Sequence, residues 1–188
     1  PNGNARYYYN ENVYRITEDT HDCKEIKQCG IELLGEIDTY ATAEMVHLAL
    51  ESLKRIDPNF TLILSHNGFV SAVLEDAGIY GENRRKVLGF LKRKNKHDLA
   101  RWCEQTDVRQ TTRERLLTIA DVCGSLKSAL AELEDLVFDD KTNAALKELT
   151  DLNSTLCNSP LADHIKLDLS VLNHLDYYNG ILLQGYVQ

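Results

Sequence analysis

Residues 13–35 read VYRITEDTHDCKEIKQCGIELLG, and this stretch decides how the fold begins. Aromatic and β-branched residues predict a strand over about residues 5–17, and apolar residues around a glutamate predict a second over about 27–37. Polar residues 18–23 lie between them, so an antiparallel pair joined by this loop is the simplest arrangement. Gly30 in the second strand indicates a bulge or a close approach of the backbone.

Helical and strand patterns follow one another along the rest of the chain. A helical pattern ends at Asp57-Pro58, a short buried strand follows, and a second helix stops at Gly78. No strand is evident from 82 to 158, where leucines at helical spacing predict short consecutive helices. Sheet character returns in HIKLDLSVL, residues 164–172, and in GILLQGYV, residues 180–187.

These patterns predict an α+β fold with a largely antiparallel sheet, flanking helices and a helical insertion. We expect a first part of the core over 1–81, the insertion over 82–158 and the final strands over 159–188. A chain of 188 residues with 43% hydrophobic content is an ordinary globular protein of one domain, with or without an insertion. It begins at Pro1 and its single methionine is Met45, so we expect a piece of a longer protein.

Composition narrows the possible functions. A net charge of −8 argues against a general polyanion-binding surface, and the one basic concentration, over 84–96, is better explained as a solvated helix face than as a nucleic-acid patch. The five cysteines show no CxxC spacing, which favours reduced thiols over disulfides or zinc. No membrane-spanning run or signal peptide is evident, so a cytoplasmic protein is predicted.

Polar residues inside the predicted strands are the candidate site residues. Gln28 and Glu32 alternate with Gly30 and so share one strand face, where they could bind an ammonium group and a polar side chain, or form a solvated outer face. Arg15 could hold a carboxylate or phosphate, or make a surface salt bridge. No histidine spacing indicates a metal site, and no nucleotide-binding or nucleophile motif occurs, so no cofactor is predicted.

Two motifs resemble those of class II aminoacyl-tRNA synthetases. VYRIT, a polar loop and then QCGIELLG resemble motif 2 in the Q-x-G-x-E form of histidyl-tRNA synthetases. LDYYNG, residues 175–180, resembles the second histidine-specific signature, which normally reads R-G-L-D-Y-Y. Both motifs occur in the family's order around an insertion, so the resemblance spans nearly the whole chain and implies the class II synthetase fold.

The resemblance also implies roles for individual residues. Arg15 matches the motif 2 arginine that holds the phosphate of ATP or of the aminoacyl adenylate. Gln28 and Glu32 match residues that hold the amino acid, and Tyr177 and Tyr178 match the tyrosine pair of the histidine pocket. A carboxylate suits the α-ammonium group, and phenol groups can pack on an imidazole and hydrogen-bond to it.

Departures from the motifs argue against adenylate chemistry. Asn173 and His174 stand where the synthetases carry arginine and glycine, and Ile26 replaces the phenylalanine that stacks on adenine. The motif 2 loop carries three carboxylates, which repel phosphates: Glu18, Asp19 and Asp22. We therefore predict no catalytic residues. This pattern resembles the non-catalytic branch of the family, the regulatory subunits of ATP phosphoribosyltransferase.

That branch implies partners and a role. Its members activate a short-form catalytic subunit and contribute to histidine feedback at the first step of histidine biosynthesis. The resemblance implies a homodimer within a hetero-oligomer, with histidine as a ligand and without tRNA. Two alternatives stay open: the catalytic core of a divergent histidyl-tRNA synthetase, and a stand-alone sensor of histidine or adenylate.

Overall fold

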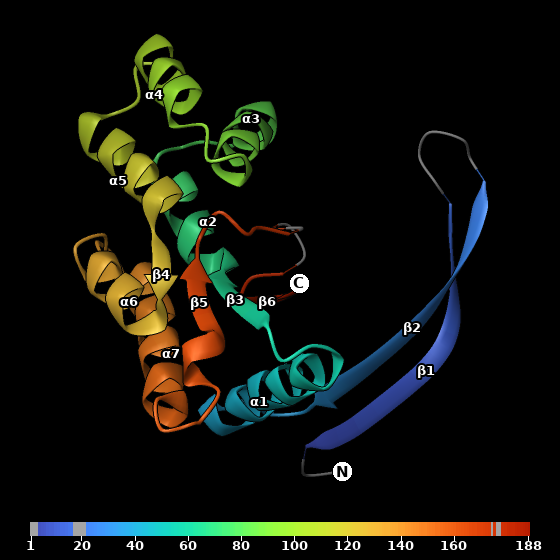
Figure 1. Ribbon diagram of the computed structural model, residues 1–188. Helices are drawn as coiled ribbons and strands as arrows, with labels where there is room; N and C mark the ends of the chain where they lie inside the picture. The colour runs from blue at the N-terminus through green and yellow to red at the C-terminus, as the bar shows by residue number, and fades with distance from the viewer. Residues whose placement is uncertain (1–3, 17–21, 174, 176–177) are drawn as a thin grey trace. The chain divides into compact units, whose positions relative to one another are not determined.

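The computed structural model describes residues 4–16, 22–173, 175 and 178–188. The chain divides into two compact units, residues 1–42 and 43–188, and each is described by itself. Figure 1 gives the helices and strands in chain order, from the blue strands near the N-terminus to the red strand at the C-terminus.

An antiparallel hairpin forms most of the first unit (Figure 1). β1 (Ala5–Ile16) and β2 (Cys23–Leu34) pair along their whole length, which confirms the predicted strand pair. β2 begins earlier than predicted, because the charged residues at its start still pair with β1. The register is unbroken, so Gly30 marks no bulge.

The second unit is built on a sheet with strand order β4-β5-β3-β6. Its strands are β3 (Phe60–His66), β4 (Cys123–Ser125), β5 (Ile165–Asp168) and β6 (Ile181–Val187). β3 pairs with β6 in the antiparallel sense and with β5 in the parallel sense, and β4 joins β5 antiparallel. The sheet is therefore largely antiparallel, as predicted.

Two details of this sheet differ from the prediction. β4 lies within 82–158, where no strand is evident from the sequence, because Cys123-Gly124-Ser125 is too short to show alternation and is fixed by pairing with β5. β5 ends at Asp168 instead of continuing to residue 172. There the chain turns, since the Asp168 carboxylate accepts hydrogen bonds from the backbone N–H (2.9 Å) and hydroxyl (2.6 Å) of Ser170.

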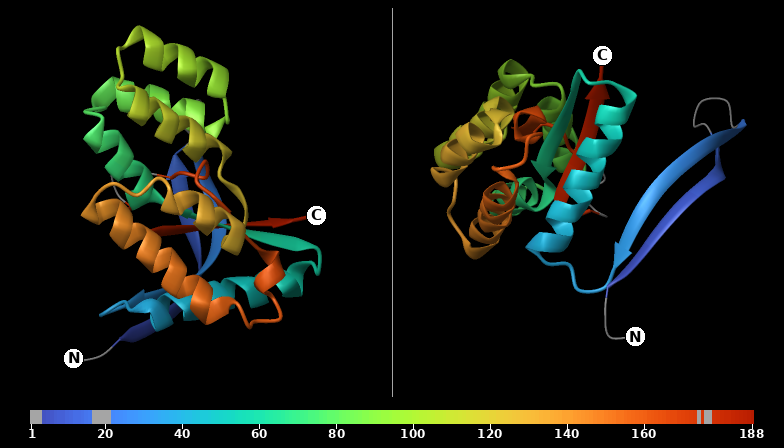
Figure 2. Two further views of the ribbon diagram at one scale, coloured as in Figure 1. Left: turned by 90° about the vertical axis from the view of Figure 1, so that its left-hand side faces the viewer. Right: turned by 60° about the horizontal axis from the view of Figure 1, so that its bottom comes forward.

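Helices surround this sheet. In chain order they are α1 (Thr39–Ile56), α2 (Asn67–Asp76), α3 (Gly81–Lys92), α4 (Lys96–Gln105), α5 (Gln110–Asp121), α6 (Leu126–Glu134) and α7 (Asp140–Leu156), with a 3₁₀ turn at Ala162–His164. α1 lies along β6 (Figure 2), and Leu53 packs against Gly185 there. α7 packs against α2 and α6, and the predicted leucine stripes supply much of the buried core. No helix in the described residues is long and apolar enough to cross a membrane.

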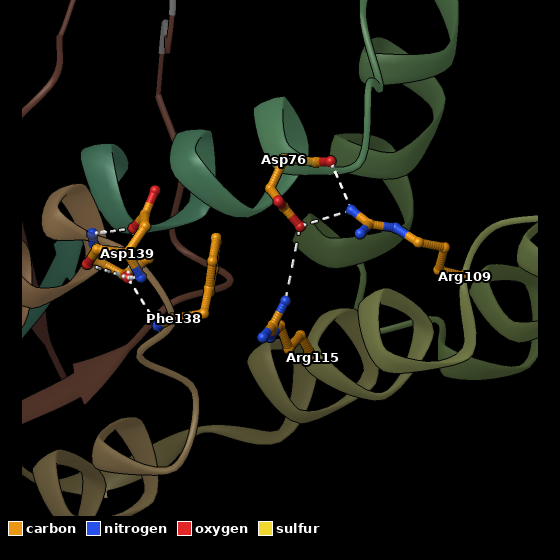
Figure 3. A network of polar contacts seen from close by, with 6 residues as sticks. Asp76, Arg109, Arg115, Phe138 and Asp139 are labelled. Carbon is orange, nitrogen blue, oxygen red and sulfur yellow. Dashed lines mark hydrogen bonds and ion pairs between the residues drawn. The ribbon is translucent and has the colours of Figure 1, made fainter.

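A polar network joins the C-terminal end of α2 to α5 and to the start of α7 (Figure 3). The Asp76 carboxylate lies 2.9 Å from the Arg109 guanidinium and 3.7 Å from that of Arg115. Arg115 also stacks over the Phe138 ring, 4.0 Å from its centroid. The next residue, Asp139, begins α7 by accepting a hydrogen bond from the backbone N–H of Thr142. α2, α5 and α7 are thus joined at one point.

Candidate functional site

The three predicted hairpin residues lie on one face of the hairpin unit. Residues opposite each other in an antiparallel pair project to the same face, and neighbours along a strand alternate. The register places their cross-strand partners on this face as well: Lys24 opposite Arg15, Glu11 opposite Gln28 and Tyr7 opposite Glu32. We call this surface, which contains Arg15, Gln28 and Glu32, the motif 2 face.

Charge is distributed along the motif 2 face. Arg15 and Lys24, both exposed, put two cations opposite each other near the hairpin loop. Like charges directly opposite repel, so an anion bound between them would relieve that repulsion. Gln28 lies four positions along β2 from Lys24, and Glu32 lies four further on, each step being about 13 Å of strand. The cationic end is therefore well separated from the Glu32 carboxylate, and Glu11, opposite Gln28, lies between them.

Tyr9 occupies the space above Gly30, its cross-strand partner. A Cβ placed on Gly30 would lie 2.3 Å from the Tyr9 Cζ, so only glycine admits the ring in this position. The Gln28 amide donates a hydrogen bond of 2.7 Å to the Tyr9 hydroxyl. The space above Gly30 is therefore filled by the Tyr9 ring from the partner strand and is not open to a ligand.

Ile26 also lies on the motif 2 face. It is opposite Val13 and has 43% of its surface exposed. An aliphatic pair therefore stands where the resembling synthetases present an aromatic ring to adenine. The acidic residues Glu18 and Asp19 of the loop lie outside the described residues, and Asp22 is exposed.

The tyrosine signature belongs to the second unit. We call residues 173–180 the tyrosine loop; Tyr177, with His174 and Asp176, lies outside the described residues. Tyr178 is 48% exposed. Asn173, at the position of the synthetase arginine, is also exposed and is a neutral amide. The second unit thus places a neutral side chain where the enzymes carry a cation.

The junction between β3 and α2 contacts the tyrosine loop and was not predicted as functional. Asn67, completely buried, donates from its side-chain amide to the carbonyls of Asn173 (2.8 Å) and Tyr178 (3.1 Å). Its backbone N–H donates to the carbonyl of Gly180 (3.0 Å). The sequence signal was a polar His-Asn-Gly triplet between a buried strand and a helix, which reads locally as an ordinary helix start.

His66 links the same junction to α7. Its Nδ1 accepts a hydrogen bond from the backbone N–H of Phe69 and so caps α2, while its Nε2 lies 3.1 Å from the Glu148 carboxylate. An accepting Nδ1 carries no proton, which places the proton of the neutral ring on Nε2, facing Glu148. Burial lowers the pKa of His66, and the neighbouring Glu148 only partly offsets this.

A pocket of about 830 Å³ opens beside the junction. α2, α3, α7 and the tyrosine loop all contribute to its walls. Its lining carries two cations, Arg84 and Lys141, and two carboxylates, Glu75 and Glu148. Lys141 pairs with Glu75 (2.6 Å), and Arg84 donates to the Ser71 hydroxyl (2.6 Å). The pocket walls therefore favour neither a cation nor an anion by net charge.

Among the described residues, no group of three or more His, Cys, Asp or Glu side chains is arranged so that it could hold a metal ion. The prediction that no cofactor is bound stays a prediction. The described residues offer groups that can recognise a ligand. One sheet face carries two cations, an amide and two carboxylates, Glu11 and Glu32, and a separately held loop carries a tyrosine.

Comparison with known proteins settles the family. The family described as histidyl-tRNA synthetase matches residues 1–188. The chain belongs to this family. The class II synthetase-like fold predicted from the two motifs is therefore confirmed, and the hairpin corresponds to the part of the chain in which motif 2 was recognised.

Curated relatives of the chain include proteins named ATP phosphoribosyltransferase regulatory subunit. The chain is 28% identical to an ATP phosphoribosyltransferase regulatory subunit of Halothermothrix orenii, covering 97% of the chain and 44% of that protein. It is 30% identical to the corresponding protein of Geobacter metallireducens, covering 97% and 42%. The chain thus spans less than half the length of these relatives.

Solved structures in the same family have the same fold. A structure from Bacillus halodurans, described as an ATP phosphoribosyltransferase regulatory subunit/histidyl-tRNA synthetase, matches with a TM-score of 0.84 at 28% identity, over 96% of the chain and 47% of that protein. A histidyl-tRNA synthetase from Nostoc matches with a TM-score of 0.73 at 14% identity, over 96% and 43%. The second match concerns the fold alone, because enzymes and regulatory subunits share it.

Proposed function

We propose that the protein containing this chain is a non-catalytic regulatory subunit of ATP phosphoribosyltransferase. The observation that carries the proposal is Asn173. In the tyrosine signature this position holds the arginine that acts on the activated carboxylate, and an amide cannot supply its positive charge to developing negative charge. The curated relatives that bear the regulatory name support the same reading.

The motif 2 face supports the loss of adenylate chemistry. Ile26 offers an exposed aliphatic surface in place of an aromatic ring, so an adenine would lose its stacking partner. Asp22, exposed and two positions before Lys24, adds a negative charge to the loop end of the hairpin, which weakens the attraction for phosphate there. Both changes act on the ATP side of the inherited site.

The part of the inherited site that would hold the amino acid has the residue types of the family motifs. We infer that Gln28, Glu32, Tyr177 and Tyr178 are the residues of a histidine-like pocket, and that Arg15 binds a carboxylate or phosphate. The support is the motif match for all five and, for Arg15, Gln28 and Glu32, their common strand face. Histidine binding would then serve feedback, because the ligand is the end product of the pathway.

The partner of such a subunit is a short-form ATP phosphoribosyltransferase catalytic subunit. We propose a homodimer within a hetero-oligomer, located in the cytoplasm. All five cysteines are free thiols, which suits a reducing compartment.

An activation assay tests the proposed function. The full-length protein, added to a short-form catalytic subunit, is expected to raise phosphoribosyltransferase activity, with an unrelated acidic protein at equal concentration as the control. Unchanged activity would contradict the proposal. In a separate assay, histidine-dependent ATP–pyrophosphate exchange is expected to be absent, and robust exchange would establish the enzyme instead.

The enzyme alternative has one observation in its favour, the retention of Arg15, Gln28 and Glu32 on a single face. A divergent histidyl-tRNA synthetase would carry an anticodon-binding domain and a motif 3 arginine in the rest of its natural chain. Calorimetry with free histidine tests the third possibility, a sensor: binding without activation of a catalytic subunit would favour it.

A further inference from the structure

We propose that Asn67 is the positioning residue of the tyrosine loop, and that it sets where Tyr178 is presented to a ligand. The inference deepens the proposed histidine pocket and rests on it for the identity of the ligand. Asn67 itself belongs to neither motif and lies at the start of α2, far from the loop in sequence.

One side chain contacts the loop at two positions, Asn173 and Tyr178. The amide of Asn67 donates one proton to the carbonyl of Asn173 and the other to that of Tyr178, at 2.8 and 3.1 Å. The two N–H bonds of a carboxamide lie in one plane at a fixed angle, so they fix the two carbonyls relative to each other. The backbone N–H of Asn67 adds a third contact, to Gly180.

Because Asn67 is buried, losing these hydrogen bonds would be costly. Asn67 has no exposed surface, so water cannot replace the amide if it is removed, and both carbonyls would lose their donor. Aspartate has the same shape, but its ionised carboxylate would face two carbonyl oxygens. Leucine offers no donor, and serine offers only one.

The residues on either side of Asn67 add to the positioning. His66 pairs with Ile181, the first residue of β6, and so fixes the strand that follows the loop. Gly68 lies against Asn179, since a Cβ at Gly68 would be 2.5 Å from the Asn179 carbonyl oxygen. The junction therefore contacts the loop at its beginning, at Tyr178 and at its end.

The test uses the full-length protein, L-histidine calorimetry and three variants. Asn67→Asp removes the donors and keeps the shape. Asn83→Asp makes the same chemical change at an exposed position of α3, and Leu99→Ala destabilises the buried core of α4 away from the loop. Asn67→Asp is expected to weaken histidine binding about tenfold, the equivalent of one lost buried hydrogen-bond pair. The two controls are expected to bind as the wild type does.

A pH profile separates positioning from general destabilisation. A buried carboxyl group has a raised pKa, and its protonated form can donate one hydrogen bond. The ratio of the Asn67→Asp dissociation constant to that of the wild type should therefore grow as the pH rises, while the Leu99→Ala ratio stays flat. Equal affinity of Asn67→Asp and wild type across the pH range, or an equal loss in Leu99→Ala, overturns the inference.

Hydrogen exchange distinguishes failure of this inference from failure of the proposed pocket. If the wild type does not bind histidine, the pocket proposal fails, but Asn67 can still be tested. Peptides covering 173–181 should then exchange faster in Asn67→Asp than in the wild type or Asn83→Asp. Unchanged exchange in these peptides would show that Asn67 does not position the loop.

Discussion

The Nε2 of His66 lies 3.1 Å from the Glu148 carboxylate, while the Nδ1 of the same ring caps α2. The Nδ1 of His66 therefore has an acceptor role that only the neutral ring can fill, whereas Nε2 faces Glu148 with a proton in either charge state. Protonation would put a proton on Nδ1, break the cap at Phe69 and place a positive charge at a helix N-terminus. The junction should consequently respond to acid.

We predict that folding stability decreases as the pH falls below about 6.5, the ordinary pKa of histidine. The pKa of His66 is lowered in the folded state by burial, so the unfolded chain binds more protons in this range. Urea unfolding at several pH values between 7.5 and 5 measures the effect. His66→Asn, which keeps a cap acceptor but does not titrate, should show a shallower pH dependence; an identical slope in both proteins would refute the assignment.

Lys94 is predicted to have a strained backbone and to stabilise the fold through the ion pair of its side chain. Its φ of 51° is left-handed, and its ammonium group lies 2.7 Å from the buried carboxylate of Asp168. Lys94→Ala loses the ion pair and keeps the backbone strain, whereas Lys94→Gly loses the ion pair and relieves the strain. We expect the glycine variant to be more stable than the alanine variant by about 1 kcal/mol in thermal or urea unfolding. The reverse order would contradict the strain argument.

The Lys94 pair also affects Asp168. Burial alone would raise the pKa of Asp168, but the hydrogen bonds from Lys94 and Ser170 hold the pKa below its ordinary value. The stability this carboxylate contributes is therefore present above pH 4 or so and is lost as the pH falls through its folded pKa.

Tyr9 and Gly30 are predicted to be energetically coupled. Gly30→Ala alone would push the Tyr9 ring away and break its hydrogen bond with Gln28, whereas in a Tyr9→Ala background the added methyl group meets no ring. A double-mutant cycle on unfolding should give a coupling energy of about 1 kcal/mol. Additive effects would show that the ring does not rest on Gly30 in solution.

Arg115 and Arg109 are predicted to differ in their tolerance of lysine. Both contact Asp76, but only Arg115 also stacks over Phe138 (Figure 3). A lysine retains charge and loses the planar stacking surface, so Arg115→Lys should cost roughly 0.5–1 kcal/mol more than Arg109→Lys. Chemical denaturation of the two variants under identical conditions measures the difference, and equal losses would argue against the stacking contribution.

The fold was predictable where a segment carries its own pattern. The hairpin strands and α1 are long and periodic, and they lie close to where the sequence places them. β4 has three small or polar residues and depends on β5 for its hydrogen bonds, so nothing local indicates it. Asp168 is buried at the end of β5 because Lys94, distant in sequence, pairs with it, and a strand pattern does not reveal such a partner.

The candidate site divides in the same way. The motifs identified Arg15, Gln28 and Glu32, and strand alternation predicted that the last two share a face. Tyr9 above Gly30 depends on the register of the hairpin, and Asn67 depends on carbonyls from residues that follow the whole insertion. Backbone acceptors have no sequence signature, so the residues that position a loop are harder to predict than those that bind a ligand.

The sheet order of the second unit has a consequence for synthesis on the ribosome. β3 is made early, yet both of its neighbours come late: Leu62 pairs with Ile165 in β5 and with Gly185 in β6. During translation the apolar residues of β3 must wait without strand partners while all of α2 to α7 emerges, which is a long loop to close. α1, made before β3, and α2, made directly after it, are then the first helices that can cover β3, and chaperone dependence should be greatest until β5 and β6 emerge.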